Sequence, residues 1–177
     1  MSLPLRTLVT STHKAVEGGR KECPAPKEKE AENPMSARPN EQLGVRTNAE
    51  VVQRTYEAVG RGDIPALLDH LTDDVEWTFQ GPSSIPFAGT RRGREGVAEF
   101  FSLVGENLKF QEFEPREFVT QGEKVVVLGY ERSLVKPTGR TFEQEWAHVY
   151  TLRDGKVATF LALEDTAAHV VAFDATT

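Results

Sequence analysis

Residues 140–153 carry the side chain best suited to acid–base chemistry. Residue types alternate along this segment, so we predict a β-strand whose side chains point in turn to opposite faces. His148 then shares one face with Trp146 and Tyr150, and burial of these rings predicts that this face points inward. An apolar environment favours the neutral imidazole, which donates or accepts one proton near neutral pH. His148 is therefore either a catalytic donor or base, or a core histidine bonded to a backbone carbonyl or to Tyr56.

Two more positions complete the catalytic candidates. Tyr56 lies on the apolar face of a predicted helix, and Glu164 and Asp165 end the last predicted strand. A carboxylate placed there can act as an acid or a base. Asp165 has a second interpretation, because with Thr166 it can cap a final helical turn. The predicted catalytic set is His148, Asp165 and Tyr56.

Large aromatic side chains are the candidates for contact with a ligand. Trp77 and Phe79 share the inward face of a predicted strand, where they can be core or pocket wall. Arg132 shares a strand face with Tyr130 and Leu134, and an inward Arg132 would need a carboxylate partner or an anionic ligand. The predicted substrate-binding residues are Trp77, Phe79, Phe87, Arg132, Trp146 and Tyr150.

Cofactor and metal motifs are missing from the sequence. The single cysteine, Cys23, leaves no thiolate metal site and no intramolecular disulfide. His70, His148 and His169 do not have the spacing of a ligand series, and we expect the first and last at the surface. No phosphate loop or dinucleotide fingerprint occurs. We predict that the protein uses no metal and no cofactor.

The elements that position these residues follow from local patterns. Thr47 to Glu50 forms a capping box before a helix, Asp63 and Pro65 begin a second helix, and residues 93–106 form a third. Strands are predicted at 75–79, 108–120, 124–135, 140–153 and 156–165, with a bulge or edge near Pro115 and a last helical turn at 166–172. Helices grouped ahead of antiparallel hairpins indicate an α+β fold with helices on one sheet face. A strongly bent sheet covered in this way forms a cone with a pocket inside.

Composition divides the chain at residue 47. All fifteen aromatic residues follow this point, whereas five of the ten prolines precede it. Residues 1–47 hold eight basic and six acidic side chains, and the remainder holds thirteen and twenty-one, giving net charges of +2 and −8. We therefore predict a disordered tail and one folded domain, residues 48–177. The acidic domain weighs against a nucleic-acid partner.

The beginning of the chain allows two interpretations. Met35 opens a plausible start, so residues 1–34 are either an overextended reading frame or a genuine disordered leader. No secretory signal and no apolar run of membrane-spanning length are present, so we expect no membrane partner. These features, with the single cysteine, predict a cytoplasmic protein.

Four segments together resemble a known family. They are GD at 62–63 with LLD at 67–69 and DD at 73–74; PFAGT at 86–90 leading to FF at 100–101; WAHVY at 146–150 with RDGKV at 153–157; and DTA at 165–167. In order and spacing the sequence is similar to SnoaL-like proteins of the ketosteroid-isomerase and nuclear-transport-factor-two superfamily. The resemblance implies a cone-shaped α+β barrel with helices packed on a strongly curved, mainly antiparallel sheet, and a homodimer. Members include isomerases, polyketide cyclases, dehydratases and non-catalytic binders.

The resemblance also bears on the site. His148 falls where ketosteroid isomerase has its oxyanion-hole acid, but Phe79 falls near the general base and Tyr56 matches the oxyanion tyrosine only to within one position. Ala162 and Leu163 replace a Glu-Tyr pair that many relatives carry. We therefore predict an apolar pocket for a small hydrophobic or carbonyl-bearing molecule. Its function would be cofactor-free isomerisation, cyclisation or dehydration, or else non-catalytic ligand binding or dimerisation.

Overall fold

Residues 47–174 are described by the computed structural model, and they lie in the second of two units of the chain, residues 42–177. The predicted tail and the alternative start at Met35 fall outside the described residues, except for Thr47. None of the helices within this range is long and apolar enough to cross a membrane.

The helices begin where the sequence predicts their caps. They are α1 (Asn48–Gly60), α2 (Ile64–Asp69), α3 (Gly93–Asn107) and α4 (Thr166–Phe173). Thr47 and Glu50 form both hydrogen bonds of the predicted capping box before α1. The Asp63 carboxylate accepts from the backbone N–H of Ala66 at the start of α2. Local sequence therefore sets where α1 and α2 begin.

Six strands form one mixed sheet in the order β2-β1-β6-β5-β4-β3. The strands are β1 (Leu71–Phe79), β2 (Gly89–Arg92), β3 (Leu108–Gln121), β4 (Lys124–Val135), β5 (Thr141–Arg153) and β6 (Lys156–Leu163). Neighbours are antiparallel except β1 and β6, which run parallel. The predicted meander from β3 to β6 is confirmed. The sequence did not predict β2, because its four residues are mostly exposed and carry no hydrophobic alternation.

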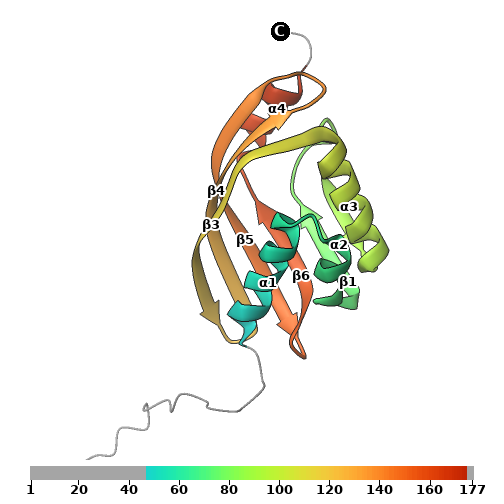
Figure 1. Ribbon diagram of the computed structural model, residues 1–177, viewed down its shortest axis with the longest axis vertical. Coiled ribbons are helices and arrows are strands. Elements are labelled where there is room, and N and C mark those ends of the chain that lie inside the picture. Colours follow the sequence, from blue (N-terminus) through green and yellow to red (C-terminus); the bar gives the residue numbers. More distant parts are fainter. Residues whose placement is uncertain (1–46, 175–177) are drawn as a thin grey trace, which may run out of the picture. The chain divides into compact units, whose positions relative to one another are not determined.

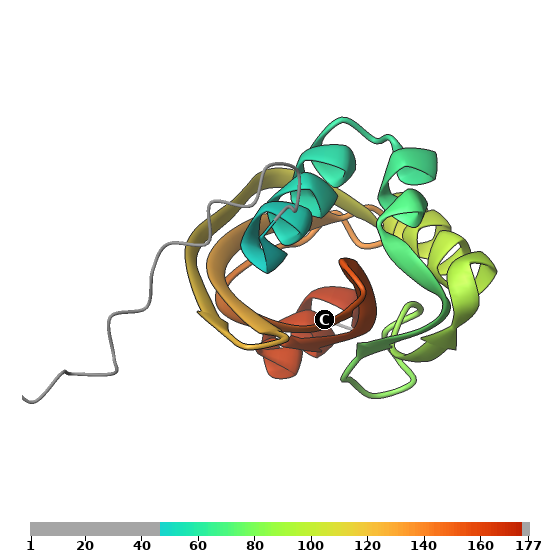
Figure 2. The same ribbon diagram turned by 90° about the horizontal axis from the view of Figure 1, so that it is seen from below.

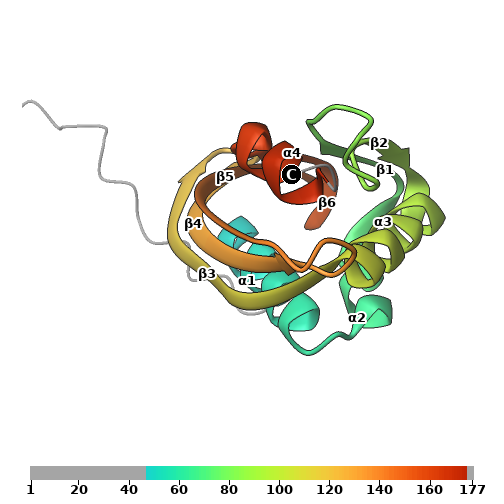
Figure 3. The same ribbon diagram turned by 90° about the horizontal axis from the view of Figure 1, so that it is seen from above.

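Curvature brings the two ends of the sheet toward each other without closing it. Register shifts interrupt β3 between Phe110 and Glu112 and between Pro115 and Glu117, near the predicted bulge. Figures 1 and 2 show the strongly bent sheet with helices along its inner side. Seen from the other end, α1 and α2 lie between the β3–β4 side and α3 (Figure 3). The predicted cone-shaped α+β architecture is confirmed.

The core fills the inner side of this bent sheet. Helix α1 packs against β3, β4 and β6, and α3 packs against β1, β2 and β3. Fully buried side chains come from every layer, and they include Val52, Leu67, Val75, Val97, Val127 and Leu152. The polar groups described next interrupt this apolar interior, so each of them needs a partner.

Candidate active site

A cavity of about 70 Å³ lies within the cone. Such a volume can hold several water molecules or part of an organic ligand. Most of its lining is aromatic and aliphatic, and its polar side chains are Thr55, Tyr56, Glu131, His148, Tyr150, Glu164 and His169. No Lys or Arg lines the cavity within residues 47–174. Polar groups that converge on an apolar cavity are the usual mark of a ligand or active site.

His148 connects a hydroxyl to a carboxylate. Its Nδ1 atom lies 2.9 Å from the Tyr56 hydroxyl, and its Nε2 atom lies 3.2 Å from Glu164 Oε1. An ionised carboxylate only accepts hydrogen bonds, so Nε2 carries the hydrogen, and Nδ1 of the neutral ring accepts from Tyr56. The result is a hydroxyl–imidazole–carboxylate chain on the cavity wall. The bond to Tyr56 is one that the core-histidine interpretation predicted, and His148 also lines the cavity that the catalytic interpretation requires.

The orientation of His148 depends on Trp146. The indole stacks on the imidazole with ring centroids 4.0 Å apart and an angle of 19° between the planes. Trp146 itself is buried but does not line the cavity. Gly129 lies opposite it on β4, and a Cβ atom at that position would approach the indole to 2.2 Å. Glycine at this position therefore leaves the space that the indole occupies.

Both cavity tyrosines stay protonated. Burial, and then the neighbouring Tyr150, raise the pKa of Tyr56 far above its ordinary value. Burial likewise raises the pKa of Tyr150. Neither side chain is thus a resting phenolate, and each can donate a hydrogen bond or pass a proton on.

A second carboxyl group, Glu131, lies in the same wall and is only 3% exposed. The Gln144 amide nitrogen donates to Glu131 Oε1 and to Glu164 Oε2, each at 2.8 Å. Burial and the charge of Glu164 raise the pKa of Glu131 to about 8. Two carboxyl groups with different environments therefore share one amide donor.

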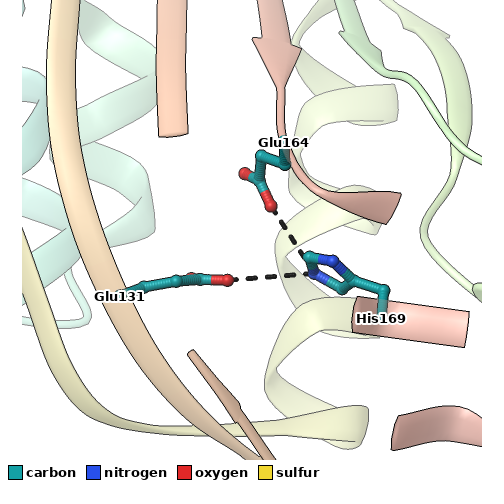
Figure 4. A group of neighbouring side chains, drawn as sticks. All are labelled: Glu131, Glu164 and His169. Carbon is teal, nitrogen blue, oxygen red and sulfur yellow. Dashed lines mark ion pairs between the residues drawn. The ribbon is translucent and has the colours of Figure 1, made fainter. Parts of the chain in front are cut away.

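His169 completes the cluster from α4, as Figure 4 shows. The prediction that it lies at the surface is wrong, because the side chain is 1% exposed. Its Nε2 atom lies 3.5 Å from Glu164 Oε2 and 3.8 Å from Glu131 Oε1. Burial lowers the pKa of His169, which favours its neutral form.

Glu131, Glu164 and His169 have the donor types of a divalent-cation site, with one ligand atom from each within 4.8 Å of the others. However, the Gln144 N–H group donates to the same two carboxylate oxygens that face His169. An amide donor turns its positive hydrogens toward those oxygens and competes with a cation there. The contacts therefore describe a hydrogen-bonded cluster better than a metal site.

The structure separates the predicted residues into three groups. Trp77, Phe79, Phe87, Tyr56, His148 and Tyr150 line the cavity. Trp146 supports His148 from behind. Arg132 and Asp165 lie elsewhere, and both are exposed.

The placements of Arg132 and Asp165 need correction. Arg132 lies on the outer face of β4, because the neighbouring residue, Glu131, points inward. Asp165 Oδ1 accepts from the backbone N–H groups of Ala167 and Ala168, so it caps α4 as the second interpretation held. The inward carboxylate at the end of β6 is Glu164 instead. Alternation along a strand shows which residues share a face, but it does not show which of the two faces points inward.

Sequence reasoning missed Glu131, Gln144 and His169 as site residues. The pairing of β4 with β5 offered a signal, since Glu131 lies opposite Gln144, which shares the face of His148. For His169 the signal was weaker, because it lies four residues after the helix-capping Asp165 in a mostly apolar helix. Neither pattern can be interpreted until the register between the elements is known, and residue types alone do not give that register.

Comparison with known proteins decides the family. A family model described as the SnoaL-like domain matches residues 52–160. The chain belongs to the SnoaL-like family. This confirms the resemblance found in the sequence. No curated protein matches the chain.

Several solved structures are similar to this SnoaL-like protein. An NTF2-like protein from Burkholderia xenovorans LB400 is 38% identical, with a TM-score of 0.68 over 74% of this chain and 100% of that chain. An NTF2-like protein from Burkholderia pseudomallei K96243 is 33% identical, with a TM-score of 0.67 over 71% and 96% of the two chains. TerC, crystallised with polyporic acid, is 30% identical, with a TM-score of 0.65 over 71% and 97%.

Proposed function

We propose that this SnoaL-like protein is an acid–base enzyme that removes a proton from a carbon atom beside a carbonyl group of a small apolar molecule. The observation that carries the proposal is the Tyr56–His148–Glu164 chain on the wall of an aromatic cavity. Isomerisation, cyclisation and dehydration all begin with this step. The residues needed for it all come from this chain.

The hydrogen bonds suggest how the proton moves. The substrate C–H bond breaks, its electrons form an enolate, and its proton passes to the Tyr56 oxygen. At the same time the proton of Tyr56 passes to His148 Nδ1, which accepts its hydrogen bond in the resting state. The imidazolium that forms is paired with Glu164 Oε1. No free phenolate is needed, which agrees with the raised pKa of Tyr56.

The cavity lining and one relative support the proposed ligand class. Trp77 and Phe160 stack with centroids 3.8 Å apart, and other rings of the wall surround them. Flat apolar molecules pack well against such walls. TerC, at 30% identity, was crystallised with a small organic acid, polyporic acid. A planar molecule that carries carbonyl oxygens is therefore the ligand class we propose.

One observation favours a second candidate, a non-catalytic binding module. Both nitrogen atoms of His148 are already bonded to protein groups, so the imidazole does not face the ligand directly. Under this alternative the chain only holds Tyr56 in place, and the Tyr56 hydroxyl binds the ligand without proton transfer.

Hydrogen–deuterium exchange separates the two candidates. The full chain is incubated in D₂O with a set of bicyclic aryl ketones such as 2-tetralone, and NMR follows deuterium at the carbon atoms beside the carbonyl. An enzyme accelerates this exchange in proportion to its concentration. A ketone that raises the melting temperature but exchanges at the rate of buffer alone would support the binding module and contradict the enzyme.

A further inference from the structure

The cluster of Glu131, Gln144 and His169 is not used by the chain of Tyr56, His148 and Glu164, although Glu131 and His169 line the same cavity. Figure 4 shows Glu131 and His169 pointing toward each other. It joins three elements, since Glu131 lies on β4, Gln144 on β5 and His169 on α4. Buried polar groups that join separate elements are costly unless each has a hydrogen-bond partner.

The hydrogen bonds of His169 show which of its nitrogen atoms carries the hydrogen. Its Nδ1 atom lies 3.2 Å from the backbone carbonyl oxygen of Asp165, and a carbonyl oxygen only accepts. Nδ1 therefore carries the hydrogen, and Nε2 of the neutral ring presents a lone pair. That lone pair faces the oxygen atoms of Glu131 and Glu164.

Charge balance then places one more proton in the cluster. Two carboxylates and a lone pair would face one another in a cavity that no Lys or Arg lines within residues 47–174. Glu164 receives hydrogen bonds from both His148 and Gln144, whereas Glu131 receives one, from Gln144. Hydrogen bonds stabilise the charged form of a carboxylate, so the group that receives fewer of them, Glu131, is the one that holds the proton.

We propose that Glu131 is a second catalytic residue, a neutral carboxylic acid that donates its proton to the carbonyl oxygen of the substrate. The proposal rests on the proposed function, because the donor is needed only where an enolate forms. As the substrate C–H proton passes to the Tyr56 oxygen and the Tyr56 proton passes to His148 Nδ1, the proton of Glu131 passes to the substrate oxygen, and a neutral enol results. Return of one proton to carbon and of the other to Glu131 restores both groups. Burial and the charge of Glu164 keep Glu131 neutral, and Gln144 and His169 are positioning residues that orient its carboxyl group.

Gln144 on β5 and His169 on α4 contact Glu131, and Glu164, which follows β6, acts on its charge. Tyr56 on α1 and His148 on β5 line the same cavity. Among residues 47–174, Glu164 is the only other carboxylate that lines the cavity, so loss of the Glu131 proton would place two negative charges together.

The test uses the full chain, the variant Glu131→Gln and the control Glu117→Gln, whose residue is exposed on β3. Glutamine keeps the size of the neutral acid but cannot release a proton. In the ketone exchange assay we expect Glu131→Gln to slow exchange by about 100-fold or more, with ketone binding retained. The control should match the wild type.

Carbon-13 NMR of glutamate-labelled protein gives a second measurement. One carboxyl carbon should titrate with a midpoint near pH 8, and it should vanish in Glu131→Gln but remain in Glu117→Gln. If Glu131→Gln fails to fold, Glu131→Asp removes the same labelled signal and keeps an acid.

The outcomes separate this proposal from the proposed function. Wild-type exchange with an unchanged rate in Glu131→Gln would overturn the role of Glu131 and leave the proposed function standing. No exchange by the wild type would overturn the proposed function. A Glu131 carboxyl that titrates in the ordinary range, or one equivalent of a divalent metal in the purified protein, would overturn the neutral acid.

Discussion

At the level of single residues, the proposed chemistry depends on which groups accept a proton and which hold one. His148 Nδ1 accepts from Tyr56, and it would receive the Tyr56 proton as the Tyr56 oxygen takes one from the substrate. Glu131 has its pKa raised to about 8 by burial and by Glu164, so it holds a proton at neutral pH. A neutral acid and a proton acceptor in one cavity are the two groups that acid–base catalysis requires.

The raised pKa of Glu131 predicts a pH dependence of stability. Between the ordinary value of 4.5 and about 8, the native state binds a proton that the unfolded chain has released. The contribution of Glu131 to the free energy of unfolding therefore falls as pH rises, by about 1.4 kcal/mol for each pH unit. Denaturant unfolding of the wild type and of Glu131→Gln should give a difference that changes with this slope. A difference that is constant from pH 5 to pH 8 would contradict the prediction.

The site residues were predicted in part because some of them sit on strongly patterned strands. The aromatic face of β5 gave His148 and Tyr150 their inward direction, and helix periodicity gave Tyr56 its inward face. On β4 both faces contain apolar residues, so the position of Glu131 could not be separated from that of Arg132. Only the pairing with β5 resolves this choice.

At the level of elements, the sequence predicted most boundaries because caps and turns are local. Asp63, Thr47 and the Asp154-Gly155 turn lie where the structure begins or ends an element. The parallel pairing of β1 with β6 was not predicted, since it joins segments about 80 residues apart that share no turn. Long-range pairing is decided by the packing of the whole domain.

Gly129 tests the contact between β4 and β5. Gly129→Ala would force its Cβ onto the Trp146 indole and to 2.6 Å from the backbone oxygen of Glu114. We expect the variant to lose roughly 1–3 kcal/mol of unfolding free energy. The control is Gly105→Ala in α3, where nothing lies within 4 Å of the new methyl group. Equal stability of the two variants would show that packing of the Trp146 indole does not require a glycine at position 129.

Asp165 tests whether the start of α4 is structural or catalytic. Asp165→Ala removes the acceptor for two backbone N–H groups and should lower the free energy of unfolding by about 1 kcal/mol. Asp165→Asn keeps a capping oxygen but no acid, so it should retain both stability and ketone exchange. Loss of exchange in a stable Asp165→Asn protein would restore the catalytic role that the sequence predicted.

At the level of the whole molecule, the outer face of the sheet carries an apolar patch. Cross-strand neighbours form two rows on it, Val126 with Val149 and Leu161, and Leu128 with Ala147 and Leu163. Leu128 and Leu163 are each 41% exposed. We propose that a second copy of the chain covers this outer face, as the family resemblance implies.

Light scattering of the purified chain tests the dimer. The wild type should have twice the mass of the 19.7 kDa chain, and Leu128→Glu should reduce it to one chain by placing a charge in the interface. Val171→Glu, at an exposed residue of α4, is the control and should stay dimeric. A monomeric wild type would contradict the assignment of this face.

The exchange rate of Tyr56→Phe tests the central claim most directly. The substitution removes one oxygen atom from the proton path and keeps the ring that packs against Trp146 and His148. Tyr130→Phe, on the outer face of β4, is the matched control. The proposed chain predicts that ketone exchange falls by about 100-fold or more in Tyr56→Phe and is unchanged in Tyr130→Phe. Wild-type exchange in a folded Tyr56→Phe protein would contradict it.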